Sequence, residues 1–248
     1  AYPLTCIYYL FFGLSLLVFH PIQWICFNVF GYQAHKKSVD YLNFCLTRCL
    51  NILGIRFSFK VSKNLPKNVP VILVANHQSM NDIPTIIWFM RRFHVKFVSK
   101  KELGKGIPSI SFNLRHGGAA LIDRTDREKA LKTLESFAKK IHDKKWSTII
   151  FPEGTRSKDG YLQRFHKGGA IIAMKSGVSI LPVTINGSRF VLPKGTLALM
   201  QGKIEVIVGE SIDSGMFGEN GKNQLIAVVK SAIQQNLDLK YGAFVKNS

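Results

Sequence analysis

His77 and Asp82 are the pair in this sequence best suited to proton transfer. They follow an unbroken apolar run, residues 71–75, which is the pattern of a strand buried on both faces. On a single helix, a separation of five residues would set the two side chains about 140° apart, so they can meet only across a strand-to-helix turn. A carboxylate placed there can fix the imidazole tautomer, and the other ring nitrogen can then take a proton from a hydroxyl.

Both residues also have a purely structural interpretation. Asp82 stands two residues before Pro84, so its carboxylate can cap a helix that begins there. His77 can be a core histidine that is hydrogen-bonded to backbone. The spacing leaves these alternatives open, and the two roles of Asp82 are compatible.

Charged residues also follow two other predicted strands. Residues 120–122 precede Asp123 and Arg124, and residues 149–151 precede Pro152, Glu153, Gly154, Thr155 and Arg156. Ligands bind beyond the carboxyl ends of parallel strands, so we expect these groups to share one rim with His77. Guanidinium groups bind phosphate oxygens bidentately. A glycine allows a tight turn, in which backbone N–H groups can point toward a ligand. The pattern predicts a phosphate clamp; the alternative is ion pairs from the arginines to Asp123, Glu153 or Asp126.

The sequence does not support covalent nucleophilic catalysis or a metal site. It contains no Gly-x-Ser-x-Gly motif, and its four cysteines (Cys6, Cys26, Cys45 and Cys49) all lie far from the predicted rim. Their spacing fits no usual zinc pattern. We therefore expect neither a metal centre nor a disulfide scaffold.

Strand and helix patterns alternate from residue 56 onward. The clearest helix is predicted over residues 127–145, where apolar side chains form one face and lysines cover the other. Such alternation predicts an α/β fold with a largely parallel central sheet flanked by helices. No linker interrupts residues 56–248, which we interpret as one α/β domain.

The amino-terminal segment is of a different kind. Residues 1–35 contain no Asp, Glu, Lys or Arg, and residues 4–19 are almost entirely apolar. Sixteen helical residues span roughly 24 Å, less than the hydrocarbon core of about 30 Å, and Pro21 either kinks one helix or starts another. We interpret residues 1–55 as a membrane-associated segment of two or three helices, which lie in one leaflet or span the bilayer. A secretory signal and a buried helix of a soluble protein are the alternatives.

The net charge is +19, from 34 basic and 15 acidic residues, and it calls for an anionic partner. Nucleic acid, an anionic membrane surface and phosphorylated substrates all qualify. Basic residues behind a charge-free apolar segment favour a membrane protein at an anionic leaflet. Aromatic and basic residues are not interleaved as in nucleic-acid-binding proteins, so we expect no nucleic acid.

Four blocks of the sequence resemble those of the glycerolipid acyltransferases, in the same order. Residues 77–82 (HQSMND) and 151–156 (FPEGTR) resemble two signature blocks, and residues 120–124 (ALIDR) and 181–183 (LPV) resemble two more. The resemblance covers roughly residues 70–190, includes the His-x4-Asp motif, and is strongest to members that acylate lysophosphatidate. Ser179, where the family often has proline, and Asn81, where an apolar residue is common, depart from the pattern.

The resemblance implies an activity: transfer of an acyl chain from acyl-coenzyme A or acyl-carrier protein to the sn-2 hydroxyl of 1-acyl-sn-glycerol 3-phosphate, giving phosphatidic acid. Glycerol 3-phosphate or another lysophospholipid is the alternative acceptor, and a non-catalytic basic membrane-binding module is the alternative class. The resemblance further implies that no cofactor is needed and that the site docks on anionic lipid at the cytoplasmic face of a membrane.

The resemblance also implies roles for individual residues. His77 would be the general base, and Asp82 would orient it. The phosphate would be bound by Arg124, Glu153, Gly154, Thr155 and Arg156, with Lys100 as a weaker candidate. Leu181, Pro182 and Val183 would shape the acyl pocket.

Overall fold

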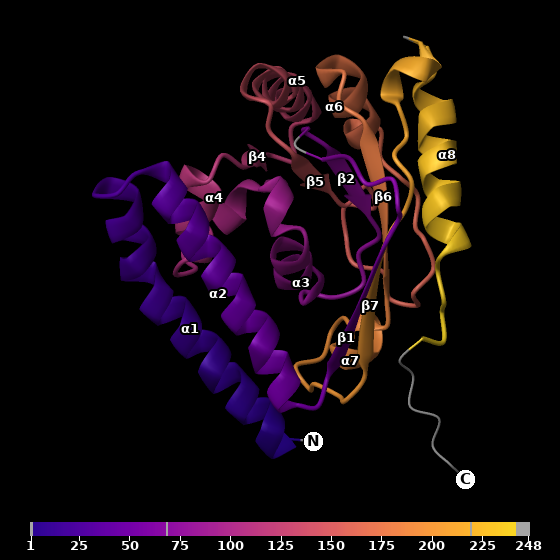
Figure 1. Ribbon diagram of the computed structural model, residues 1–248. Helices are drawn as coiled ribbons and strands as arrows, with labels where there is room; N and C mark the ends of the chain where they lie inside the picture. The colour runs from indigo at the N-terminus through magenta and orange to yellow at the C-terminus, as the bar shows by residue number, and fades with distance from the viewer. Residues whose placement is uncertain (1, 68, 219, 242–248) are drawn as a thin grey trace.

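The computed structural model describes residues 2–67, 69–218 and 220–241, and it is built around one seven-stranded sheet (Figure 1). The strands are β1 (Arg56–Val61), β2 (Ile72–Ala75), β3 (Lys96–Lys100), β4 (Ala120–Ile122), β5 (Thr148–Ile150), β6 (Ile180–Asn186) and β7 (Lys203–Val208). The helices are α1 (Tyr2–Asn28), α2 (Tyr32–Ile52), α3 (Asp82–Phe89), α4 (Ile110–His116), α5 (Arg127–Lys144), α6 (Gly168–Ser176), α7 (Ser188–Val191) and α8 (Lys222–Gln235).

The sheet has the order β1-β7-β6-β2-β5-β3-β4 and is largely parallel, as predicted. Strands β6, β2, β5, β3 and β4 run in one direction, whereas β7 is antiparallel to β6 and parallel to β1. The carboxyl ends of five strands therefore meet at one edge, which is where ligands bind in such sheets. The segments that follow β2, β4 and β5 carry the candidate site residues.

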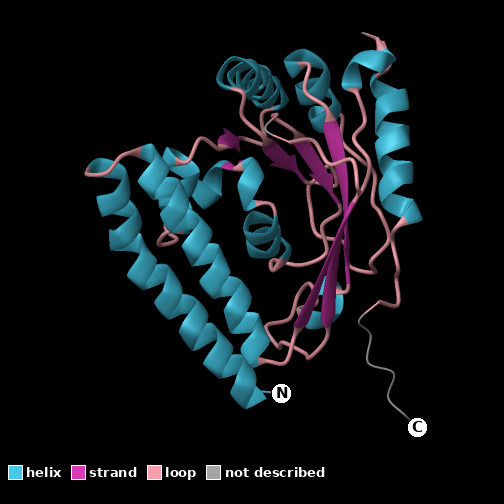
Figure 2. Ribbon diagram, in the orientation of Figure 1, coloured by secondary structure: helices cyan, strands magenta, loops and turns pink. Residues whose placement is uncertain are grey.

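Helices cover both faces of the sheet (Figure 2). Within β2, Leu73 and Ala75 pack toward α3 and the amino-terminal helices, while Ile72 and Val74 pack toward α5, α6 and α8. Successive side chains of a strand point to opposite faces, so a strand between two helical layers must be apolar at every position. This explains the unbroken apolar run before His77.

The amino-terminal segment forms a hairpin of two helices, α1 and α2, beside α3 (Figure 1). Pro21 lies inside α1, so the segment up to Asn28 is a single helix of 27 residues and roughly 40 Å. Among the described helices, α1 is the one long and apolar enough to cross a membrane (Pro3–Asn28). Its outer face exposes large apolar side chains, among them Leu10 and Leu17.

The hairpin is also attached to the α/β part by a shared core. Tyr8 of α1 and Leu50 of α2 belong to the same buried cluster as Leu73 and Val183 of the sheet. The division into residues 1–55 and 56–248 therefore follows the chain but not the core, and it stays a prediction.

Candidate active site

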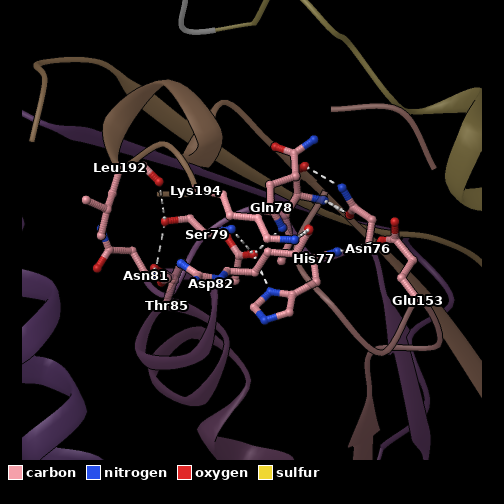
Figure 3. A network of polar contacts seen from close by, with 12 residues as sticks. Asn76, His77, Gln78, Ser79, Asn81, Asp82, Thr85, Glu153, Leu192 and Lys194 are labelled. Carbon is pink, nitrogen blue, oxygen red and sulfur yellow. Dashed lines mark hydrogen bonds and ion pairs between the residues drawn. The ribbon is translucent and has the colours of Figure 1, made fainter. Parts of the chain in front are cut away.

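His77 and Asp82 are in direct contact across the turn between β2 and α3 (Figure 3). The imidazole Nδ1 lies 2.8 Å from Asp82 Oδ2, and the His77 side chain keeps 15% of its surface exposed. An ionised carboxylate only accepts hydrogen bonds, so Nδ1 carries the proton of this contact. Nε2 is then the basic nitrogen, available to a hydroxyl group at the surface of the site.

The Asp82 carboxylate holds the turn as well as the imidazole. Oδ2 accepts the backbone N–H of Gln78 at 2.7 Å and that of Ser79 at 2.8 Å, and the side chain is fully buried. Asp82 is the first residue of α3, yet its carboxylate binds His77, Gln78 and Ser79, which all precede the helix, so it does not act as a helix cap. Its negative charge in the first turn is nevertheless favourable to the helix dipole.

Three groups from the segment after β5 fix the position of His77. The Phe151 ring stacks on the imidazole, with centroids 4.3 Å apart and an interplanar angle of 27°. Glu153 Oε1 accepts the backbone N–H of His77 at 2.9 Å, and Ser157 N donates to the His77 carbonyl at 2.8 Å. His77, which follows β2, is thus connected to the turn after β5 through its ring and its backbone.

Both oxygens of Glu153 are used on backbone groups. Oε2 accepts the N–H of Gln163 at 2.9 Å, while Oε1 binds His77 as described. Burial raises the pKa of Glu153, and the two N–H donors oppose that shift. This geometry gives Glu153 a positioning role, and its part in the phosphate clamp stays a prediction.

Gly154 makes the turn after β5 possible. Its φ is +66°, and a Cβ there would lie 3.2 Å from His166 Cδ2 and 3.7 Å from Arg124 Nη1. The Arg124 guanidinium donates a hydrogen bond to the Gly154 carbonyl. The segments that follow β4 and β5 therefore meet at the predicted rim.

The arginines do not form the ion pairs considered as alternatives. Asp123 pairs with Lys101, and Asp126 pairs with Lys129 at 2.9 Å. Within the described part of the chain, the half-buried Arg156 side chain has no hydrogen bond or ion pair. Lys100 is exposed at the end of β3, where it pairs in register with Ile122 of β4. These cations remain available to an anion.

Lys194 is a site residue that the sequence did not indicate. It lies in the loop after α7 and donates to the Arg156 carbonyl at 2.7 Å and to Thr155 Oγ1 at 3.1 Å. The same loop is tied to the histidine segment, because Ser79 Oγ donates to the Leu192 carbonyl at 3.2 Å. Its position shortly after the carboxyl end of β6 is the signal that could have found it.

Leu181, Pro182 and Val183 lie in the middle of β6 and are all buried. Leu181 pairs in register with Leu73, and Val183 pairs with Ala75, two residues before His77. They form part of the core beneath the histidine segment, and their role in an acyl pocket stays a prediction. Among the residues described, no group of three or more His, Cys, Asp or Glu side chains could hold a metal ion.

The fold and the site together are those of an acyltransferase. Residues 56–186 match the family named Acyltransferase, and the chain belongs to it. It is therefore an enzyme that transfers acyl groups.

Relatives narrow the class further. The chain is 32% identical, over 232 residues, to the 1-acyl-sn-glycerol-3-phosphate acyltransferase of Chlamydomonas reinhardtii, covering 91% of this chain and 67% of that protein. It is 26% identical to the enzyme of the same name from Pseudomonas aeruginosa, covering 84% and 80%. A chloroplastic relative from Arabidopsis thaliana is 32% identical and covers 71% of this chain, which spans about half of that protein (48%).

A solved structure resembles the fold closely. The 1-acyl-sn-glycerophosphate (LPA) acyltransferase PlsC from Thermotoga maritima has a TM-score of 0.80 and 28% identity, and the match covers 94% of this chain and 93% of that one. The match extends over nearly the whole chain, so it includes the amino-terminal hairpin as well as the sheet.

Proposed function

We propose that this chain transfers an acyl chain from an acyl thioester to the sn-2 hydroxyl of 1-acyl-sn-glycerol 3-phosphate, giving phosphatidic acid. The observation that carries the proposal is the 2.8 Å contact between His77 and Asp82, on a rim that also holds unpaired cations. The names of the relatives from algae, plants and bacteria support this acceptor.

The reaction follows from the protonation state of His77. Nε2 accepts the proton of the sn-2 hydroxyl while the oxygen attacks the thioester carbonyl carbon. The C–S bond breaks, and the leaving thiolate takes the proton from the imidazolium, so an ester and a thiol replace a thioester and an alcohol. Asp82 stabilises the imidazolium through Nδ1. No covalent enzyme intermediate and no cofactor is needed, because the acyl donor is a co-substrate.

The phosphate of the acceptor would bind at the turn after β5. Arg156 and Lys100 contribute free positive charge, and Gly154 allows Thr155 and Arg156 to approach a ligand. Arg124 supports the turn through the Gly154 carbonyl and adds its own charge. Glu153 serves the same site by fixing the backbone of His77 rather than by touching an anion.

The acyl pocket would lie above the buried strand β6. Val183 pairs with Ala75, so Leu181, Pro182 and Val183 lie beside the strand that leads to His77. In this proposal they support the floor of the pocket from inside the core. Replacement of Val183 with the larger Phe would then shift the preferred chain length, which a series of acyl-coenzyme A donors measures.

The enzyme would act at the cytoplasmic face of a membrane, with α1 in the lipid. Leu10, Leu14 and Leu17 are at least half exposed on α1, and the basic residues all follow residue 35. A variant with Lys at these three positions should lose binding to anionic vesicles. Leu131→Lys, at an exposed leucine of α5, is the matched control.

A donor–acceptor grid tests the proposed reaction. Wild-type protein in detergent is given acyl-coenzyme A or acyl-carrier protein, together with lysophosphatidate, glycerol 3-phosphate or a lysophospholipid without a free phosphate. We expect phosphatidic acid as the main product. A preference for glycerol 3-phosphate would correct the acceptor, and no product in any combination would contradict the proposed reaction.

A further inference from the structure

We propose that Lys194 is a further phosphate-binding residue, which holds the acceptor phosphate together with Arg156; this rests on the proposed function. The Lys194 ammonium donates to the Arg156 carbonyl at 2.7 Å and to Thr155 Oγ1 at 3.1 Å. Both acceptors are neutral, and an ammonium group has three N–H donors. One donor and the whole positive charge remain for a ligand.

The charge of Lys194 has no anionic partner inside the protein. Among the described residues, no carboxylate lies within ion-pairing distance of its Nζ, although the side chain is only half exposed. Its neighbour Arg156 is half-buried and equally unpaired. The Lys194 ammonium thus adds a second partly desolvated positive charge to the turn that carries Arg156, and a dianionic phosphate would offset the charge of both side chains.

The position of Lys194 matches the geometry of the acceptor. In lysophosphatidate the sn-2 oxygen and the phosphorus are separated only by C2, C3 and one ester oxygen, so the phosphate must bind close to His77. Ser157, next to Arg156, donates to the His77 carbonyl at 2.8 Å. Figure 3 shows the Lys194 side chain extending toward the segment that carries His77 and Asp82.

The loop that carries Lys194 is well anchored. Its first residue, Leu192, accepts a hydrogen bond from Ser79 Oγ at 3.2 Å, and Leu199 N donates to Thr5 Oγ1 of α1 at 3.2 Å. The loop that carries Lys194 is thus held on one side of this residue by the histidine segment and on the other by the amino-terminal helix.

The alternative is that Lys194 only clamps the turn through Thr155 and Arg156. Equilibrium binding separates the two roles. In a His77→Ala background, which prevents turnover, we would measure dissociation constants for lysophosphatidate and for a monoacylglycerol of the same chain, which lacks the phosphate. Glycerol 3-phosphate, added as a competitor of lysophosphatidate, provides a second phosphate probe that has no acyl chain.

We expect Lys194→Met to weaken the binding of lysophosphatidate and of glycerol 3-phosphate about tenfold each, because one charge-assisted hydrogen bond is lost. The binding of monoacylglycerol should stay unchanged. Lys194→Arg should restore most of the affinity. Lys158→Met, which removes an exposed lysine two residues from Arg156, is the matched control and should change neither ligand.

The proposal would be overturned if Lys194→Met weakened the binding of lysophosphatidate and monoacylglycerol equally, or left the competition by glycerol 3-phosphate unchanged. Lys194 would then only hold the turn in place. The proposed function fails separately. In that case the protein with an intact His77 would form no phosphatidic acid from lysophosphatidate, whatever residue stands at position 194.

Discussion

The hydroxyl of Tyr8 donates a hydrogen bond to Asn81 Oδ1 over 3.2 Å, inside the protein. Tyr8 belongs to the apolar helix α1, and Asn81 is the residue before Asp82, which holds the imidazole of His77. The helix that exposes leucines to its surroundings is therefore in direct contact with the catalytic segment. We therefore expect the geometry of the site to depend on how α1 packs against this segment.

Tyr8→Phe tests this dependence. The substitution leaves Asn81 Oδ1 buried without a donor, which costs about 1–3 kcal/mol of stability, and it loosens the segment before Asp82. We expect a lower midpoint of thermal unfolding in detergent and a several-fold lower kcat. Tyr9→Phe removes the neighbouring, partly buried hydroxyl and should change little. Equal effects of the two substitutions would show that the Tyr8–Asn81 contact does not support the site.

Asp82→Asn should abolish most of the activity. An amide at this position cannot stabilise an imidazolium through charge, and its NH2 group would face the N–H donors of Gln78 and Ser79. We expect kcat to fall by roughly 10³-fold with a smaller change in KM. Steady-state kinetics on folded protein measure this, with Asp143→Asn on the exposed face of α5 as a control. A higher KM with an unchanged kcat would contradict the orienting role of Asp82.

Gly154→Ala and Gly177→Ala form a matched pair. Both glycines have nearly the same left-handed φ, +66° and +65°, so alanine strains either backbone by about 1–2 kcal/mol. A Cβ at Gly154 would also press on His166 at 3.2 Å, whereas nothing lies within 4 Å at Gly177. We expect similar losses of stability and a loss of activity only for Gly154→Ala. Full activity of that variant would mean that the turn tolerates displacement.

A buried lysine far from the rim makes stability depend on pH. Lys96 is 2% exposed, and its ammonium contacts the Tyr32 hydroxyl and, at 2.9 Å, His94 Nε2. Burial and the nearby Lys36 lower the pKa of Lys96 to about 7, against an opposing effect of Asp40. Burial also lowers the pKa of His94 to about 3.

Between pH 7 and about 10.5, the unfolded chain therefore binds a proton at Lys96 that the folded chain does not bind. This contribution makes the free energy of unfolding rise with pH across that window and leaves it flat below pH 7. Relative to Lys96→Met, the wild type should gain roughly 2 kcal/mol between pH 7.5 and 9.5 in denaturant titrations. The exposed Lys132→Met should show no such slope. A difference independent of pH would place the folded pKa of Lys96 near its ordinary value.

The central contact of the site could be predicted from the sequence because it is local. His77 and Asp82 are joined by one strand-to-helix turn, and their spacing permits contact only there. The meeting of Arg124 with the turn at Gly154 was also predictable, since both follow parallel strands. The carboxyl-end rule for parallel sheets is sufficient for both.

Other features depend on tertiary contacts that no local pattern records. An apolar strand pattern does not encode direction, so the antiparallel pairing of β7 with β6 was not predicted. The short helices α4 and α7, of seven and four residues, are below the length at which periodicity is informative. Lys194 reaches Arg156 from 38 residues away, and Glu153 accepts the backbone N–H groups of His77 and Gln163.

The structure explains why residue 81 is the polar Asn81, where the family pattern often has an apolar residue. The sequence marks it as a polar residue where an apolar one is common. In the structure it is 2% exposed, and its side-chain oxygen Oδ1 accepts a hydrogen bond from the hydroxyl of Tyr8, a residue of α1 that lies 73 positions earlier. That partner is invisible in the sequence around position 81.

The most direct test of the account is acyl transfer from acyl-coenzyme A to 1-acyl-sn-glycerol 3-phosphate in detergent, with wild type compared with His77→Ala. The 2.8 Å contact to Asp82 makes His77 the base, so the wild type should form phosphatidic acid and the folded variant should lose at least 10²–10⁴-fold in kcat. Equal rates for both proteins would show that His77 is structural, and the mechanism would then be wrong.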